Sequence, residues 1–224
     1  MTVVYTLGKG STWQNNELRY SIRSFVKYTA VNHIIIVGYL PDWLQGVEYV
    51  PFPDTPRKQF NIHVKTSLAC QLVPEFIQAA DDHILLEYND FSARYYSGLL
   101  KDKKFTGRYA EALANTRRVA DGAYYNVHTP AQIISEHYLH IMRQPAIDWG
   151  NKEYLIKSLY GNCLGIHISK ELPTDVKIST HLRRSGIEKF VQGKSFLSFS
   201  DGGLSTDLRR WLAERFPDKS KYER

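Results

Sequence analysis

The first 39 residues contain the pattern that most restricts the fold of this chain. Residues 3–7 form a short β-branched and aromatic run, and a small, polar turn follows at residues 8–11. Apolar side chains then recur at helical spacing over residues 15–28, and residues 33–39 form a continuous apolar run typical of a buried parallel strand. A strand, a glycine-containing turn, a helix and a second strand predict a right-handed βαβ unit. The first turn of such a unit lies at the sheet edge where ligands bind.

The middle of the chain continues with strands and helices. Residues 47–50 resemble a short strand, and residues 64–80 resemble a helix, ended or interrupted near Pro74, that leads into a strand at 83–86. The long stretch from Phe91 to Leu159 is predicted to be mainly helix and loop. Its clearest helix spans residues 130–142, with a proline near its start.

The carboxyl-terminal part adds two candidate strands and a last helix. The strands are predicted at residues 164–168 and 195–199, and the amphipathic helix at 204–216. Together, these elements predict a single α/β domain over residues 1–224. We expect a Rossmann-like mixed sheet flanked by helices, with a helical insertion in the middle of the chain.

Composition and charge limit the cellular setting and the partners. The chain has a net charge of +6, which favours a polyanionic partner such as a nucleic acid, although solvated helix faces explain most of its basic pairs. Cys70 and Cys163 lie in apolar segments without metal-ligand spacing, which indicates buried thiols in a reducing compartment. With no leader-like start and no apolar run of bilayer length, we expect a cytoplasmic protein (in the host cytoplasm if it is viral) that does not contact a membrane.

Acidic residues follow the apolar run at residues 84–86. The sequence continues with Glu87, Asn89 and Asp90, so a buried strand would deliver carboxylates to the edge of the sheet. Such an edge suits a divalent cation and its phosphate ligands. The alternative is a helix N-cap, in which the Asn-Asp pair binds the free amides of a following helix.

A second acidic strand end lies near the carboxyl terminus. Asp201 and two glycines follow the apolar run at residues 196–199. Asp201 suits a metal ligand or a catalytic base, although Asp-Gly-Gly is also an ordinary turn sequence. Two such strand ends in one α/β domain favour a metal–nucleotide site more than either does alone.

Two further segments carry chemistry of weaker specificity. The turn Gly8-Lys9-Gly10-Ser11 has the small residues that let backbone amides approach a diphosphate, but it is neither a Walker motif nor a full GxGxxG. His128 precedes the predicted helix at 130–142 and suits a general base or a phosphate-neutralising group. A polar loop residue is at least as good an interpretation of His128.

Several short blocks, in order along the chain, resemble the Stealth family of sugar-phosphate transferases. The opening blocks are VVYTLGKGS (3–11), NNELRYSIRS (15–24) and IIIVGYLPDWL (34–44). The later blocks are FNIHV (60–64), LEYND (86–90), NVHTP (126–130) and the closing DGG…FPDKSKYE (201–223). Members of that family transfer a sugar-1-phosphate from a nucleotide sugar. Only the second block is distinctive by itself.

The resemblance implies a nucleotide-sugar fold of the GT-A kind, with residues 1–90 as the nucleotide-binding half and residues 91–224 as the acceptor and catalytic half. It implies a nucleotide-sugar donor, expected to be a UDP-sugar, and Mg²⁺ or Mn²⁺ as cofactor. The residues implied for donor binding are Thr6, Leu7, Gly8, Lys9, Arg19, Arg23 and Asn61. Those implied for the metal are Asn89, Asp90 and Asp201, and those implied for catalysis are Asp201, His128 and Asp90.

One departure from the family pattern leaves the reaction open. The family usually has an acidic residue before its first block and a Trp after it, where this chain has Thr2 and Leu7. We therefore expect a metal-assisted transferase that moves either a sugar or a sugar-1-phosphate to a hydroxyl group. A hydroxymethylated base in phage DNA suits a compact basic enzyme, and a surface polysaccharide is the family-typical acceptor. The third alternative is a non-catalytic nucleic-acid-binding protein.

Overall fold

A five-stranded, mostly parallel sheet forms the centre of the computed structural model, which describes residues 1–9, 11–164 and 168–224. Its strand order is β3-β2-β1-β4-β7, and only β7 is antiparallel to its neighbour. The strands are β1 (Thr2–Leu7), β2 (His33–Gly38), β3 (Glu48–Pro51), β4 (Glu75–Ala79) and β7 (Ala131–Ile134). The chain runs from β1 outward to β2 and β3, then returns to pair β4 with the other side of β1. The switch in strand order therefore lies between β1 and β4, the place where open α/β sheets bind ligands.

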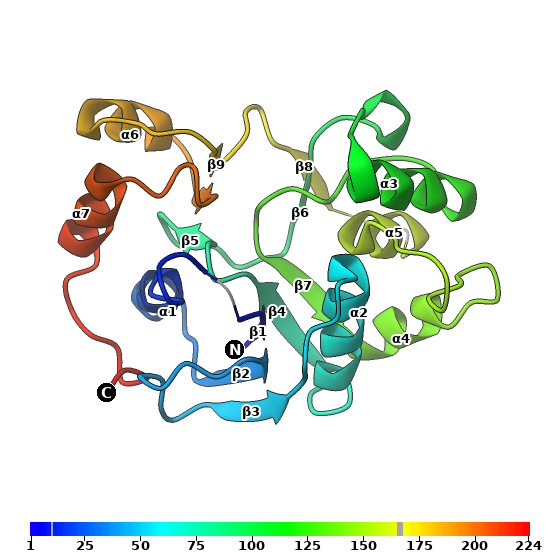
Figure 1. Cartoon of the computed structure of the whole chain (residues 1–224), viewed down its shortest axis with the longest axis horizontal. Coiled ribbons are helices and arrows are strands. Elements are labelled where there is room, and N and C mark those ends of the chain that lie inside the picture. Colours follow the sequence, from blue (N-terminus) through cyan, green and yellow to red (C-terminus); the bar gives the residue numbers. More distant parts are fainter. Residues whose placement is uncertain (10, 165–167) are drawn as a thin grey trace.

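Helices cover both faces of this sheet, as Figure 1 shows. One face packs on α1 (Glu17–Tyr28), and the other on α2 (Lys58–Ala69), α4 (Ser135–Met142) and α5 (Ile156–Cys163). Successive side chains of β1 point to opposite faces of the sheet. Val3 and Tyr5 therefore pack in the hydrophobic cluster under α1, whereas Val4 packs in the cluster under α2, α4 and α5. The βαβ unit predicted from the first 39 residues is confirmed.

Two smaller sheets and further helices complete the molecule. β10 (Phe196–Phe199) lies between β5 (Ile84–Leu85) and β9 (Lys177–Ile178), and β6 (Arg94–Tyr96) pairs with β8 (Ser169–Glu171). The remaining helices are the short 3₁₀ helix η1 (Leu100–Asp102), α3 (Gly107–Val119), α6 (Arg184–Val191) and α7 (Thr206–Arg215). The predicted mixed α/β sheet flanked by helices is confirmed, as are the strand near 195–199 and the last helix.

The helix predicted over 64–80 is wrong in its second half. α2 ends at Ala69, and residues 75–79 form β4. Four successive residues from Phe76 to Ala79 are buried, because β4 lies between β1 and β7 with helices on both faces. A strand buried on both faces has no alternation of apolar and polar residues, which is why its short run resembles a piece of buried helix.

The helix predicted over 130–142 is also divided. Its first part is β7, in which Ile133 pairs with Phe76, and α4 begins only at Ser135. The β-branched pair Ile133-Ile134 favours a strand where a partner edge is available. The candidate strand at 164–168 includes residues 165–167, which lie outside the described residues. No helix in the described ranges is long and apolar enough to cross a membrane.

Candidate functional site

The carboxyl ends of β1 and β4 lie side by side, and each continues into a polar turn. β1 is followed by Gly8 and Lys9, and β4 is followed by Asp81 and Asp82. The strands are parallel and in register to Ala79, so the two turns leave the sheet at the same edge. An edge that offers backbone amides on one side and two carboxylates on the other suits a diphosphate with a divalent cation.

Small polar residues of α1 fix the turn that carries the two aspartates. Ser21 Oγ donates to the carbonyl of His83 at 2.6 Å, and Ser24 Oγ accepts from the Leu85 amide at 2.9 Å. The His83 Nδ1 accepts from the Ala80 amide at 3.2 Å, which closes the turn from within. Burial lowers the pKa of His83 to about 3, so the ring stays neutral and keeps the lone pair that this bond needs.

Asp81 and Asp82 have opposite electrostatic surroundings. Burial raises the pKa of Asp81, and the negative charges of Asp82 and Glu17 raise it further. Burial also acts to raise the pKa of Asp82, but the adjacent His83 ring, the hydrogen bond from Ser198 Oγ at 2.7 Å and the nearby Lys177 hold it below its ordinary value. A cation between two such carboxylates would relieve their mutual repulsion.

Two more acids approach this edge from different parts of the chain. Glu17, in the first turn of α1, is only 6% exposed, and its Oε2 has no hydrogen-bond partner in the described structure. Burial raises its pKa, with additional repulsion from Asp201 and Asp82. The hydroxyl of Thr12 donates to Asp201 at 2.8 Å and so connects the turn after β10 to the turn after β1. The predicted site residue Asp201 therefore lies on the same side as the two aspartates after β4.

His128 reaches the same region from the segment before β7. Its Nδ1 lies 3.9 Å from Asp175 Oδ1, and its positive charge would be felt by Asp82. The bond from His128 is the largest cause that lowers the pKa of Asp175. Lys157, in α5, donates to the carbonyls of Val127 and Thr129 on either side of His128.

The other side of the β1 end is shaped by α2. The buried Lys65 Nζ donates to the Leu7 carbonyl at 2.7 Å and pairs with Asp54 at 2.6 Å. A Cβ on Gly8 would lie 2.9 Å from Asp54 Oδ2, so the backbone there is closely packed. Asn61 does not face this edge freely, because its amide oxygen and nitrogen are both bound to Thr55.

The remaining residues predicted for donor binding, Thr6, Leu7 and Lys9, lie at or just after the end of β1. Thr6 is half-buried, the Leu7 side chain lies in the core, and Lys9 is exposed with its Nζ 5.8 Å from the Tyr39 ring. Leu7 thus borders the edge with its backbone and not with its side chain.

Asn89 and Asp90 are not brought to the end of the central sheet. They follow β5, which pairs with β10 in a separate small sheet. Asn89 Oδ1 accepts from the Phe91 amide at 2.8 Å, and the exposed Asp90 accepts from the amide and hydroxyl of Ser92. Such bonds are typical of Asx turns, and the bond from the Ser92 amide is the largest cause that lowers the pKa of Asp90.

Arg19 and Arg23 are occupied elsewhere. Both bind the buried carboxylate of Glu223, at 3.1 and 2.7 Å, and Arg23 also donates to the Phe216 carbonyl. Their guanidinium groups therefore fasten the end of the chain to α1.

The residues present fit one particular way of holding a divalent cation. Among the described residues, no group of three or more His, Cys, Asp or Glu side chains is arranged to hold a metal ion. Mg²⁺ commonly takes only one or two carboxylates from the protein and completes its shell with water and substrate phosphates. Asp81 and Asp82 supply that number at the edge where a diphosphate would bind.

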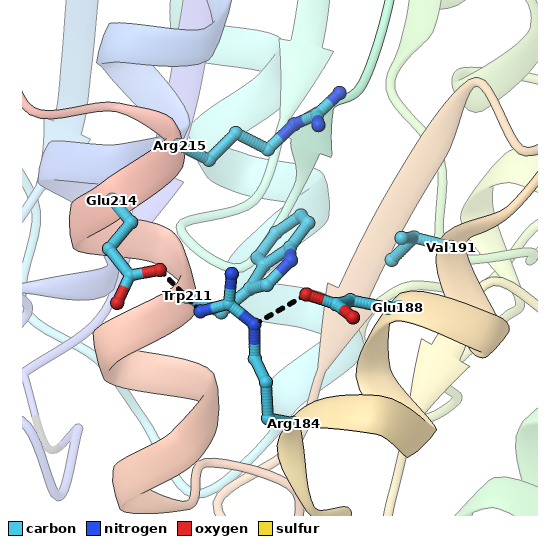
Figure 2. Close-up of a pocket in the computed structure, with 6 residues that line it drawn as sticks. All are labelled: Arg184, Glu188, Val191, Trp211, Glu214 and Arg215. Atoms are coloured by element: carbon cyan, nitrogen blue, oxygen red, sulfur yellow. Dashed lines mark hydrogen bonds and ion pairs between the residues drawn. The ribbon is translucent and has the colours of Figure 1, made fainter.

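A separate surface pocket of about 360 Å³ lies between α6 and α7 (Figure 2). Arg184 bridges Glu188 at 2.7 Å and Glu214 at 2.5 Å across it, and Trp211 and Arg215 line its wall. The acid pairs already neutralise Arg184, and no residue of the β1–β4 edge lines this pocket. We assign the candidate site to the strand ends.

Sequence reasoning missed Asp81 and Asp82. The sequence contains the apolar run FIQAA (76–80) followed by these two acids, which is the pattern of a strand with acids at its end. The helix predicted over 64–80 covered this run, so the strand was not predicted. Glu17 and Lys157 lie in the first turns of α1 and α5. Neither has a local sequence pattern that distinguishes it from a surface residue.

No protein family and no curated protein matches this chain in sequence. Among solved structures, an active-site mutant of LgtC is similar, with a TM-score of 0.51 over 99% of this chain and 98% of that one, at 9% identity. A second structure, of the galactosyltransferase LgtC in complex with donor and acceptor sugar analogs, is 12% identical. It covers 97% of this chain and 94% of its own, with a TM-score of 0.46. So few identical residues leave the fold as the shared property: this chain has the mixed α/β fold of GT-A glycosyltransferases.

Proposed function

We propose that this chain is a metal-assisted transferase that moves a sugar, or a sugar-1-phosphate, from a nucleotide-sugar donor to a hydroxyl acceptor. The observation that carries the proposal is the pair Asp81 and Asp82 at the end of β4, beside the glycine turn after β1. The pair lies at the switch in strand order of a GT-A fold, where a nucleotide would cross the sheet edge.

The donor would lie across the first part of the chain. The backbone from Thr6 to Lys9 would face the diphosphate, and Asp81 and Asp82 would hold Mg²⁺ or Mn²⁺ against its oxygens. We transfer the metal role expected for Asn89 and Asp90 to this pair, because the former two are bound in a turn of another sheet. A bound divalent cation would neutralise the charge that develops on the leaving phosphate.

The acceptor would be activated by residues of the second part, 91–224. His128 and Asp201 approach the edge from that part, and either suits the removal of the acceptor's hydroxyl proton. In sugar transfer, the acceptor oxygen bonds to the anomeric carbon and the bond from that carbon to the diphosphate breaks. In sugar-phosphate transfer, the oxygen bonds to the β-phosphorus and a nucleoside monophosphate leaves, as Stealth-type enzymes would do.

A UDP-sugar is the donor we propose, and a nucleic acid is the acceptor that the charge favours. The net charge of +6 suits a polyanion, and a hydroxymethylated base flipped out of DNA would present the required hydroxyl. A surface polysaccharide is the alternative acceptor. A compact enzyme that meets nucleotide sugars and DNA would work in the cytoplasm.

A thermal-shift screen of nucleotide sugars with Mn²⁺ or Mg²⁺ tests the proposal. A donor at about one hundred times its dissociation constant stabilises the fold by about 2.7 kcal/mol, which raises the melting temperature by roughly 5–10 °C for a chain of this size. We expect the shift to require the metal, and Asp82→Asn to abolish both the shift and donor turnover.

Asp90→Asn is the matched control, because Asp90 is exposed and its carboxylate serves only a turn. It should keep the shift and the turnover. If no donor stabilises the wild-type protein, while nucleic acid binds with a steep salt dependence, the chain is a binding protein and the enzyme proposal fails.

A further inference from the structure

We infer that Lys157 is a positioning residue, which holds His128 toward the Asp81–Asp82 end of β4 by binding the backbone on both sides of His128. The inference deepens the proposed function and rests on it, because donor turnover is its main readout. Lys157 lies in the first turn of α5, far in sequence from both acidic strand ends.

The hydrogen bonds of Lys157 anchor the two neighbours of His128 and do not involve the His128 ring, which lies near Asp175. Lys157 Nζ donates to the Val127 carbonyl and, at 2.9 Å, to the Thr129 carbonyl. Val127 and Thr129 are 7% and 2% exposed, whereas the His128 side chain between them is 40% exposed. One buried cation thus binds the carbonyl of the residue before the accessible imidazole and the carbonyl of the residue after it.

The next residue of α5 fastens the segment that leads to His128. Ser158 Oγ accepts from the amides of Tyr125 and Asn126, at 3.0 and 3.2 Å. The Asn126 side chain accepts in return from the Ser158 amide at 2.8 Å. Lys157 is therefore the last attachment before His128, and its loss would release the imidazole while the preceding segment stays in place.

The charges around Lys157 make its ammonium form sensitive to neutral pH. Burial, together with repulsion by Arg94 on β6, lowers the pKa of Lys157 to about 7, although Asp82 after β4 acts in the opposite direction. The neighbouring rings of His83 and His128 face the same region. Since charged hydrogen bonds are stronger than neutral ones, the hold on Val127 and Thr129 should weaken as the pH rises through about 7.

A double-mutant cycle separates positioning from simple stability. We would measure kcat and KM for the nucleotide sugar in the wild type, Lys157→Met, His128→Ala and the double variant, with Lys103→Met as control. Lys103 follows η1 and donates to the side-chain oxygen of Ser97, and not to a carbonyl beside His128. We expect Lys157→Met to lower kcat by about tenfold or more with the donor KM nearly unchanged, because a misplaced catalytic group affects the chemical step. In the His128→Ala background, Lys157→Met should lower kcat no further, because both substitutions remove the same contribution of His128.

The pH profile provides a second readout, and it also covers failure of Lys157→Met to fold. The kcat of the wild type should fall as the pH rises above about 7, and Lys157→Arg, which cannot lose its proton in this range, should remove that fall. Full activity of Lys157→Met, additive effects in the cycle, or an unchanged pH profile in Lys157→Arg would each overturn the inference while leaving the proposed function intact. Absence of turnover in the wild type would instead overturn the proposed function and the inference with it.

Discussion

Among the described residues, His63 and His83 are held neutral by their surroundings. The ring of His63 stacks on Trp149 with centroids 3.9 Å apart and an interplanar angle of 3°, and its Nδ1 lies 3.1 Å from the Tyr138 hydroxyl. Burial lowers the pKa of His63 to about 4 and that of His83 to about 3. An unfolded chain would protonate both near pH 6.5, so each histidine resists folding once acid begins to charge it.

His63→Phe should therefore make the protein less sensitive to acid. Between pH 6.5 and 4 the unfolded wild type binds a proton that the folded state excludes, so the stability falls as the pH falls through this window. We expect His63 to account for about 1–2 kcal/mol of that loss, because its side chain is partly solvated. Urea midpoints from pH 7 to 4 measure the effect, and the variant should lose less stability than the wild type as the pH falls. Parallel curves for variant and wild type would contradict it.

At the same scale, some residues of the candidate site can be found from the sequence and others cannot. Asp201 and His128 stand out in sequence, as an acid after an apolar run and a polar residue before Pro130, and the structure brings both toward the β4 end. Asn89 and Asp90 have an equally good local pattern, but their strand belongs to the small β5–β10–β9 sheet. The local sequence indicates that a carboxylate follows a strand. The sheet to which that strand belongs depends on its pairing with strands that are distant in the sequence.

Among the elements, the β1–β2 pair shows how tightly the candidate site is built. Gly38 ends β2 with φ +122°, and a Cβ there would lie 2.1 Å from the Leu7 carbonyl oxygen and 2.7 Å from Lys65 Nζ. The Leu7 carbonyl also accepts from the Tyr39 amide at 3.1 Å and from Lys65. The absence of a side chain at Gly38 thus allows β1, β2 and α2 to meet at the turn that would face the donor.

Gly38→Ala should destabilise the fold by about 3 kcal/mol or more, because it combines a strained φ with a backbone clash that cannot relax locally. Gly193→Ala is the matched control: Gly193 has φ +70°, but a Cβ there meets nothing within 4 Å. That control should cost only about 1 kcal/mol, the strain of the conformation alone. Chemical denaturation measures both values, and equal losses would show that the contact with Leu7 is unimportant.

Element prediction succeeds where periodicity is clear over a long segment and fails for two short strands of the central sheet. The helix α1 and strand β2 follow their sequence patterns closely, since one is amphipathic and the other is long and apolar. β4 and β7 were both assigned to helices, because each is short and buried against its neighbours in the sheet. Their pairing register, with Phe76 opposite Ile133, is a long-range property that local spacing does not contain.

At the scale of the whole molecule, the two ends of the chain are joined through α1. Glu223, with a fully buried side chain, binds Arg19 and Arg23, and the Arg224 amide donates to the Trp43 carbonyl at 2.9 Å. The same helix holds the Asp81–Asp82 turn through Ser21 on another face. A change near Glu223 can therefore reach the candidate site through α1, since Arg19 and Arg23 of the NNELRYSIRS block are paired with Glu223.

Glu223→Gln should destabilise the whole fold by about 2–4 kcal/mol, because it leaves two largely buried guanidinium groups without a counter-charge. Burial acts to raise the pKa of Glu223, but the bonds from Arg23, Ser220 and Arg19 hold that pKa below its ordinary value. The ionised Glu223 therefore stabilises the fold fully at a pH above the ordinary pKa of a glutamate. This stabilisation is lost as the pH falls through the lowered pKa of the folded state. Glu188→Gln is the control, since its pair with Arg184 is exposed to solvent and should contribute little to stability. Thermal unfolding with and without donor distinguishes a role of Glu223 in fold stability from an effect of Glu223 on the Asp81–Asp82 turn. A lower melting temperature with an unchanged donor-induced shift would place Glu223 in the scaffold alone, whereas loss of the shift would show that the terminus acts on the Asp81–Asp82 turn through α1.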